Sequence, residues 1–388
     1  MGVRVLLALV VLGLSPSLAA PAIPDDLSND PLDRGALIAL PGIYQVEARF
    51  TVGGLSTRLN GEQQLDTGGP VTVVGSAFGV ATGGWILTAD HLVNGTSATL
   101  AVAALSRDVG AQARLGTDDP EEWVEQTGAR AVDVRALDIR LRHVESGPGA
   151  PPLAAALQRS EPEADMALLR TDRTDAPVLE LDDSQSVGTP VATIGFGGGG
   201  EGGVAGPAIR QGALANTGTI AGRGSRVFTQ VTSPVRSGDS GGPAIDAEGN
   251  VRGMVITRAR VGGNLVPGPQ IRRFVGTERI EVASGTQESY REGLDHFWAL
   301  DFEASSLAME RALEAYPEHP LAEAFVRRAA ELSGASVSIG GPDIARSFLR
   351  ALALVSAVIS LGLAALLVRH DTRQRHPRRL PTTTIDQD

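Results

Sequence analysis

A serine flanked by glycines stands in the second half of the chain, in the stretch Ser237-Gly238-Asp239-Ser240-Gly241-Gly242-Pro243. Because glycine adopts tight turns and positive φ angles without steric cost, the backbone can bend sharply on both sides of Ser240. The amide N–H groups of Gly238 and Ser240 can then point toward one spot, which is the arrangement that binds an oxyanion. The stretch therefore predicts a nucleophilic serine with two backbone donors beside it.

Two segments upstream carry groups that can activate this serine. The segment 84–91 reads Gly-Trp-Ile-Leu-Thr-Ala-Asp-His, so His91 stands at the end of a predicted strand. Asp165 precedes the apolar run 166–169, whose burial as a strand would carry the carboxylate to the edge of the core. Serine is inert at its own pKa and needs a histidine to take its proton and a carboxylate to orient that histidine. We therefore predict His91, Asp165 and Ser240 as catalytic residues that work through an acyl-enzyme.

Other residues compete for the roles of base and carboxylate. Asp133 and Asp138 lie on an alternating strand that has no apolar run behind it. We expect His143 to be exposed, because it lies on the same arginine-rich strand. The other histidines belong to a helical part of the chain or follow a C-terminal apolar segment: His296, His319, His370 and His376.

Four motifs in this order resemble the trypsin-like serine proteases, most closely the bacterial HtrA/Deg branch. They are Gly-Ser-Ala-Phe at 75–78, Thr-Ala-x-His at 88–91, Asp-x-Ala-Leu-Leu at 165–169 and Gly-Asp-Ser-Gly-Gly-Pro at 238–243. The resemblance implies a mainly β fold, a double β-barrel with the three catalytic residues in the cleft between the barrels, within a domain at 44–277.

The spacing of apolar runs independently favours a mainly β fold. Short β-branched runs separated by glycine and polar clusters are typical of sandwiches and barrels. We expect strands at residues 44–52, 71–80, 85–88, 131–144, 191–196, 227–232 and 251–257.

The chain departs from this family at several points. Asp90 stands where the family usually has alanine, and the long gap between His91 and Asp165 predicts an insertion around 114–152. No PDZ domain follows the protease domain. Residues 52–54 resemble the new N-terminus of cleaved zymogens, but a first strand is favoured there, and Asp239 can then pair with an arginine.

The resemblance also implies a substrate preference. Pro234, six residues before Ser240, stands where enzymes that cut after Arg or Lys have an aspartate, so a small or medium apolar residue is expected before the scissile bond. Ile256, Thr257 and Arg258 are expected to pair with the substrate backbone as an added strand. Arg258 could instead narrow the cleft. The expected substrates are polypeptides, and no cofactor and no metal are predicted.

Composition excludes several kinds of chemistry. The chain has 388 residues, no cysteine and no lysine, so all 34 basic residues in the Lys+Arg count are arginines. Thiolate nucleophiles, zinc-thiolate sites, Schiff bases and Ser-Lys dyads are therefore impossible. The net charge is −11, and several arginines are concentrated in the last twenty residues, which leaves an acidic body. Such a body repels phosphate, so nucleic acid is not an expected partner.

Two apolar segments predict export and membrane anchoring. Residues 1–20 read as a signal peptide with cleavage near Ala19 or Ala20, the alternative being an uncleaved anchor. Residues 351–368 contain no charge and would span about 27 Å as a helix, which predicts a transmembrane helix in contact with lipid. The arginine-rich segment 369–388 predicts a cytoplasmic tail, with residues 21–350 outside the cytoplasm.

A helical region is predicted at 285–334, with linkers at 21–43 and 335–350. Apolar residues recur at helical spacing over 290–302, 305–316 and 321–332. Gly293, Ala312 and Pro317 weakly resemble a tetratricopeptide repeat, which would suit a protein partner. A helical spacer packed on the β domain is the alternative.

Together these patterns predict a membrane-anchored, extracytoplasmic serine endopeptidase that acts in quality control or processing of exported proteins. One alternative is a non-catalytic transmembrane protein that binds peptides or signals through the barrel and the helical region. Another is a sensor protease that cleaves one specific partner.

Overall fold

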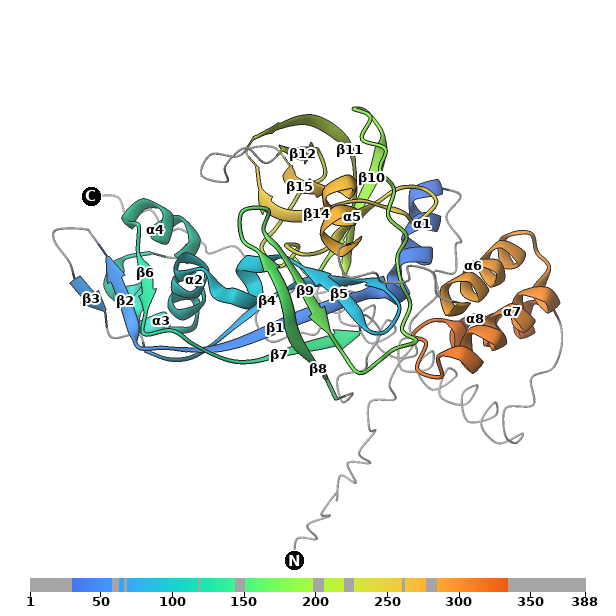
Figure 1. Cartoon of the computed structure of the whole chain (residues 1–388), viewed down its shortest axis with the longest axis horizontal. Helices are drawn as coiled ribbons and strands as arrows, with labels where there is room; N and C mark the ends of the chain where they lie inside the picture. Colours follow the sequence, from blue (N-terminus) through green and yellow to red (C-terminus); the bar gives the residue numbers. More distant parts are fainter. Residues whose placement is uncertain are drawn as a thin grey trace, which may run out of the picture. The chain divides into compact units, whose positions relative to one another are not determined.

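Two closed antiparallel β-barrels of six strands each form the body of the protein (Figure 1). The computed structural model describes residues 30–57, 63–65, 68–117, 119–143, 151–197, 206–219, 227–259, 262–276 and 285–333. The first barrel has the order β1-β4-β5-β9-β8-β7, with strands Ile43–Val52 (β1), Gly69–Ala81 (β4), Trp85–Thr88 (β5), Arg135–His143 (β7), Leu153–Glu161 (β8) and Met166–Arg170 (β9). The second has the order β10-β11-β12-β15-β14-β13, with strands Pro190–Gly195 (β10), Ala208–Thr219 (β11), Val227–Val231 (β12), Pro243–Ile245 (β13), Val251–Arg258 (β14) and Gly263–Pro267 (β15). The predicted double barrel is confirmed.

β1 shows how the sequence pattern builds a barrel wall. Val46, Ala48, Phe50 and Val52 are buried, while the residues between them are partly exposed. Since successive side chains of a strand point to opposite faces, this alternation turns one face to the core. β1 pairs with β4 on one side and β7 on the other, and so closes the first barrel.

A small sheet and three helices extend the first barrel. The sheet has the order β3-β2-β6, with strands Gly54–Thr57 (β2), Gln63–Leu65 (β3) and Arg130–Val132 (β6). Figure 1 shows it beside helices Ser97–Arg107 (α2), Val109–Leu115 (α3) and Pro120–Thr127 (α4).

The predicted insertion, 114–152, overlaps these added elements only in part. The added helices begin at Ser97, before the predicted start, and β7, within the predicted range, belongs to the barrel. β8 escaped the pattern since its Leu-Ala-Ala-Ala-Leu start lacks the β-branched residues that mark strands. The predicted strand 131–144 is divided at Asp133, whose φ of 53° ends β6.

Residues 31–42, predicted as linker, instead form helix Pro31–Ala39 (α1) and a 3₁₀ turn, Leu40–Gly42. Asp30 caps the helix by accepting the N–H of Leu32 at 2.8 Å. Gly35 packs on the turn between β13 and β14, where a Cβ atom would lie 2.2 Å from the carbonyl oxygen of Asp246. The proline and aspartate that suggest a linker serve here as first helical residue and N-cap.

The C-terminal helices of the described chain pack against α1 and the barrels. They are Gly285–Trp298 (α6), Phe302–Ala315 (α7) and Ala322–Leu332 (α8), close to the predicted ranges, and helix Gly268–Gly276 (α5) precedes them. Tyr290 Oη donates to the Leu37 carbonyl at 3.1 Å, and Gln287 Nε2 donates to the Ile38 carbonyl at 2.8 Å. These contacts favour a helical element packed on the β domain.

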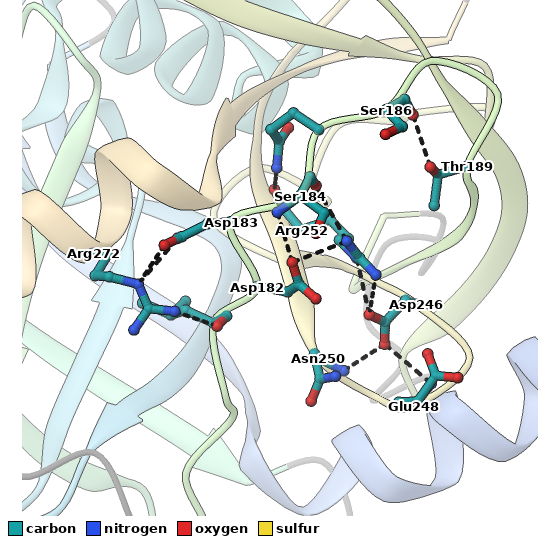
Figure 2. A network of polar contacts seen from close by, with 12 residues as sticks. Asp182, Asp183, Ser184, Ser186, Thr189, Asp246, Glu248, Asn250, Arg252 and Arg272 are labelled. Atoms are coloured by element: carbon teal, nitrogen blue, oxygen red, sulfur yellow. Dashed lines mark hydrogen bonds and ion pairs between the residues drawn. The ribbon is translucent and has the colours of Figure 1, made fainter.

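The segment joining the barrels is held against the second one by the ion pairs of Arg252 (Figure 2). Arg252 Nη1 lies 3.0 Å from Asp182 Oδ1, and Arg252 Nη2 lies 2.8 Å from Asp246 Oδ2. Asp246 also accepts the backbone N–H groups of Glu248 and Asn250, which shapes the turn before β14. The backbone N–H of Asp182 donates to the Val251 carbonyl at 2.9 Å, so the connection runs alongside β14.

Within the described ranges, no helix has the length and apolarity needed to cross a bilayer. The predicted signal peptide 1–20, linker 335–350, transmembrane segment 351–368 and tail 369–388 lie outside the described residues. These assignments stay predictions.

His143, expected to be exposed, has both of its ring nitrogens buried. Its ring meets the edge of Tyr44, with centroids 4.7 Å apart. Burial lowers the pKa of His143 to about 4, and burial together with nearby His143 lowers the pKa of His319 to about 3. The strand alternation could not show this, because Tyr316 and Glu318 of the helical part, far away in the sequence, line a pocket together with His143.

The two buried histidines predict a loss of stability in acid. In the unfolded chain they protonate near pH 6.5, whereas the native state resists protonation down to about pH 4 for His143. The free energy of unfolding should therefore fall as the pH drops from 6.5 to 4, by up to about 1.4 kcal/mol per pH unit for each histidine. Urea unfolding of the purified protein at pH 7.0, 5.5 and 4.5 measures this slope.

The substitution His143→Phe should flatten the slope. An identical slope in His143→Phe and in the unsubstituted protein would contradict the assignment.

Candidate active site

Strand pairing brings His91 and Asp165 together at one end of the first barrel. His91 follows β5 and opens a π-helical turn, His91–Gly95, while Asp165 directly precedes β9, which pairs with β5. His91 Nδ1 lies 2.8 Å from Asp165 Oδ2, and the His91 backbone N–H donates to Oδ1 at 2.9 Å. The carboxylate is 2% exposed. This pairing places the imidazole proton on Nδ1 and leaves Nε2 as an acceptor.

The competing aspartates lie elsewhere. Asp138 pairs with Arg49 at 2.8 Å and with Arg140 at 3.0 Å. Asp133 lies against Gly53 of the small-sheet extension. Of the three candidates, Asp165 is the one that contacts His91.

The loop around Ser240 is as tightly turned as its glycines predict. Gly238 has a φ of +95° and Gly241 of +84°. A Cβ atom on Gly241 would lie 2.0 Å from the Ser76 carbonyl oxygen and 3.1 Å from the Ala89 nitrogen. Because Ala89 is two residues before His91, this packing sets the loop beside the histidine.

The Ser240 hydroxyl donates to the carbonyl oxygen of Ile256 at 3.1 Å. In the part of the chain that the structure describes, it forms no hydrogen bond with His91. Catalytic hydrogen bonds are often long in free enzymes and tighten in the substrate complex. The arrangement is therefore compatible with a nucleophile that turns toward His91 when substrate binds.

Asp239 is a fully buried carboxylate that holds the serine loop in place. Arg210 Nη1, from β11, lies 2.9 Å from Oδ1 and 2.8 Å from Oδ2 of Asp239. The backbone N–H groups of Gly197 and Arg236 each donate to the same carboxylate at 2.8 Å. The expected pairing of Asp239 with an arginine is present, while Val52 is buried in β1.

Asp90 forms a polar cluster beside the catalytic pair. Its buried carboxylate accepts hydrogen bonds from Asn94 Nδ2 and Ser160 Oγ, both at 2.5 Å. Its backbone N–H donates to the Asp165 carbonyl at 3.2 Å. The cluster joins the His91 turn to the hairpin that carries Asp165. In the sequence, the cluster is indicated only by an aspartate at position 90, where the family usually has alanine. The hydrogen-bond partners of Asp90 could not be predicted without the fold.

The predicted substrate-binding residues lie near the serine loop. Pro234 is exposed, Ile256 is buried, and Thr257 Oγ1 accepts a hydrogen bond from Asn264 at 3.1 Å. The backbone of Arg258 ends β14, and its side chain lies outside the described set. On one side of β14, β13 pairs only as far as Met254. In the described chain, residues 256–258 therefore have no strand partner on that side.

These groups suit acyl transfer. They are a serine hydroxyl, an imidazole oriented by a buried carboxylate, and two N–H groups in a turned loop. Gly238 and Ser240, the predicted oxyanion donors, flank the anchored Asp239.

Comparison with known proteins supports the same domain. Residues 75–254 match the family model described as a trypsin-like peptidase domain. An uncharacterized protein of Sinorhizobium fredii, y4bJ, is 32% identical over 115 residues, which are 29% of this chain and 17% of that protein. The match thus spans about a sixth of the relative's length.

Two solved structures are similar at low identity. The active form of the Rv3671c protease from M. tuberculosis is 16% identical, with a TM-score of 0.41 over 66% of this chain and 88% of that chain. The HtrA-type protease AlgW with a decapeptide is 18% identical, with a TM-score of 0.42 over 63% of this chain and 66% of that chain.

Loss of the Arg210 guanidinium should lower the stability of the protein and the reactivity of Ser240. The substitution Arg210→Met leaves the Asp239 carboxylate buried without its cation, which typically costs about 3–5 kcal/mol of stability. The folded fraction should also react more slowly with a fluorophosphonate probe. Urea unfolding and the labelling rate measure the two effects.

Arg173→Met is the matched control, because Arg173 pairs with Glu318 at an exposed site and should contribute less than about 1 kcal/mol. Equal behaviour of the two variants would show that the buried ion pair has no special role.

Proposed function

We propose that this protein is a serine endopeptidase, whose residues 75–254 match the trypsin-like peptidase domain model, and that it hydrolyses peptide bonds with His91, Asp165 and Ser240 as its catalytic residues. The observation that carries the proposal is the contact of His91 Nδ1 with the buried Asp165 carboxylate, at 2.8 Å, beside the Ser240 loop. Placement of a base, its orienting group and a serine in one location is what nucleophilic acyl transfer requires.

In the proposed reaction, Ser240 Oγ attacks the scissile carbonyl carbon while His91 Nε2 takes its proton. Asp165 stabilises the imidazolium, and the N–H groups of Gly238 and Ser240 bind the oxyanion of the tetrahedral intermediate. His91 then gives the proton to the leaving amine, and the acyl-enzyme forms. Water, deprotonated by His91, attacks the acyl-enzyme and releases the acid product, with the proton returning to Ser240.

The substrate is proposed to bind as an extended strand along residues 256–258. In the described chain β13 does not pair beyond Met254, which supports such pairing. In this structure the Ile256 carbonyl accepts the Ser240 hydroxyl, a bond that a bound substrate would replace. Pro234, in place of an acidic residue, supports a small or medium apolar residue before the scissile bond rather than Arg or Lys.

We further propose that the chain is anchored in the membrane with its catalytic domain outside the cytoplasm. The sequence of residues 1–20, the uncharged segment 351–368 and the arginines that follow support this topology. Unfolded or exported proteins would then be the polypeptide substrates.

The substitution Ser240→Ala should abolish hydrolysis of unfolded casein and labelling by a fluorophosphonate. The reason is that both reactions need the Ser240 oxygen as nucleophile. Ser186→Ala, at an exposed serine in the segment between the barrels, should retain both activities. Gel analysis of casein fragments and mass spectrometry of the labelled peptide provide the measurements.

The outcome also separates the alternatives. A protein that neither cuts casein nor becomes labelled is a peptide-binding barrel rather than an enzyme. Labelling at Ser240 without casein cleavage indicates a protease restricted to one partner.

A further inference from the structure

Ser76 is a fully buried polar residue where the two barrels meet. It lies on β4 of the first barrel, in the Gly-Ser-Ala-Phe motif, and sequence analysis gave it no role of its own. Its side chain faces the serine loop of the second barrel, as its contacts show.

Four hydrogen bonds converge on this one residue. Its backbone N–H donates to the Ser240 carbonyl at 2.8 Å, and its Oγ donates to the Gly238 carbonyl at 2.7 Å. The same Oγ accepts the N–H of Phe196 at 3.0 Å, at the end of β10. The Ser76 carbonyl accepts the hydroxyl of Thr88 at 2.7 Å. The donor and one acceptor position of the hydroxyl are thus both used.

These bonds fix the loop on both sides of Asp239. One holds the carbonyl of Gly238, the other holds the carbonyl of Ser240, and Arg210 holds the Asp239 side chain between them. With these positions held, the N–H groups of Gly238 and Ser240 have little freedom to turn. A donor site of this kind needs no reorganisation when negative charge develops on the substrate oxygen.

Glycines of the serine loop and of β10 lie close against Ser76. A Cβ atom on Gly241 would lie 2.0 Å from the Ser76 carbonyl oxygen, and one on Gly242 would lie 3.1 Å from Ser76 Cβ. A Cβ atom on Gly195 would lie 3.0 Å from Ser76 Oγ. The glycines after Ser240 therefore allow close contact with β4.

We propose that Ser76 is a positioning residue for the oxyanion-binding loop, and that its hydroxyl aligns the N–H groups of Gly238 and Ser240 from the opposite barrel. This inference rests on the proposed peptidase function. It assigns to the first barrel, which carries His91 and Asp165, a further role in shaping the donor site on the second.

The test compares Ser76→Ala with Ser305→Ala in the purified full-length protein. Ser305 is also fully buried, and its hydroxyl donates to the Gly293 carbonyl at 2.8 Å in the helical region, so both substitutions remove a similar hydrogen bond. Thermal unfolding should show a comparable loss of stability in the two variants. Casein hydrolysis then gives kcat and KM for each.

Ser76→Ala should lower kcat about 10- to 100-fold with KM within about two-fold, since small misplacements of catalytic groups have effects of this size. Its affinity for a peptide boronic acid, whose tetrahedral adduct needs the oxyanion donors, should fall by a similar factor. Ser305→Ala should leave kcat and boronate affinity unchanged. Equal kcat in the two variants overturns the proposal.

If Ser76→Ala fails to fold, Ser76→Cys is the second variant, because a thiol is a weaker donor to the Gly238 carbonyl and a weaker acceptor from the Phe196 N–H. It should lower kcat about three-fold without changing KM, and an unchanged kcat overturns the proposal. Failure of the unsubstituted protein to cut casein or label at Ser240 overturns the proposed function itself. If the unsubstituted protein is active and Ser76→Ala leaves kcat unchanged, only the positioning role is overturned.

Discussion

The contact between β4 of the first barrel and the Ser240 loop of the second is the constraint on which the candidate site depends. The two segments approach so closely that a Cβ atom at Gly241 would lie 2.0 Å from the Ser76 carbonyl oxygen. Because His91 and Asp165 belong to one barrel and Ser240 to the other, the site exists only while this contact is kept. The short hydrogen bond from the Ser76 N–H to the Ser240 carbonyl, at 2.8 Å, lies at its centre.

A buried ion pair completes the support of the loop. Asp239 has no exposed surface, and a carboxylate in that position is tolerated only with a cation and several N–H donors around it. Arg210 supplies the cation from β11 of the same barrel, and its planar guanidinium binds both carboxylate oxygens. The loop is thus held by the Arg210 guanidinium of the same domain. Residues 52–54, which resemble the new N-terminus of cleaved zymogens, lie instead in and beside the first strand.

The N-terminal and C-terminal helices extend the same core. α1 packs on the turn between β13 and β14 through Gly35, and α6 hydrogen-bonds to α1 through Gln287 and Tyr290. His143 lies near the same helical part, since it lines one pocket with Tyr316 and Glu318. A helical region joined in this way is part of the structural unit that holds the barrels. A role in recruiting a partner would have to use its outer surface.

Local patterns in the sequence were sufficient for a mainly β fold, for most of its strands, and for the residues that the structure brings together as His91 and Asp165. Each of these depends on short-range information: period-two alternation, glycines around a turned serine, or a carboxylate before an apolar strand. The double barrel was implied instead by the resemblance of four ordered motifs to the trypsin-like proteases. Local patterns placed the insertion at 114–152, although the added helices begin at Ser97 and β7 belongs to the barrel, because the pairing of distant strands is not visible in them. They also could not identify α1 as a packed helix, since its burial depends on a turn more than 200 residues away. The partners of Asp239, Asp90 and Ser76 were decided only by the tertiary structure, because a buried polar group takes whichever donor or cation the folded chain places beside it.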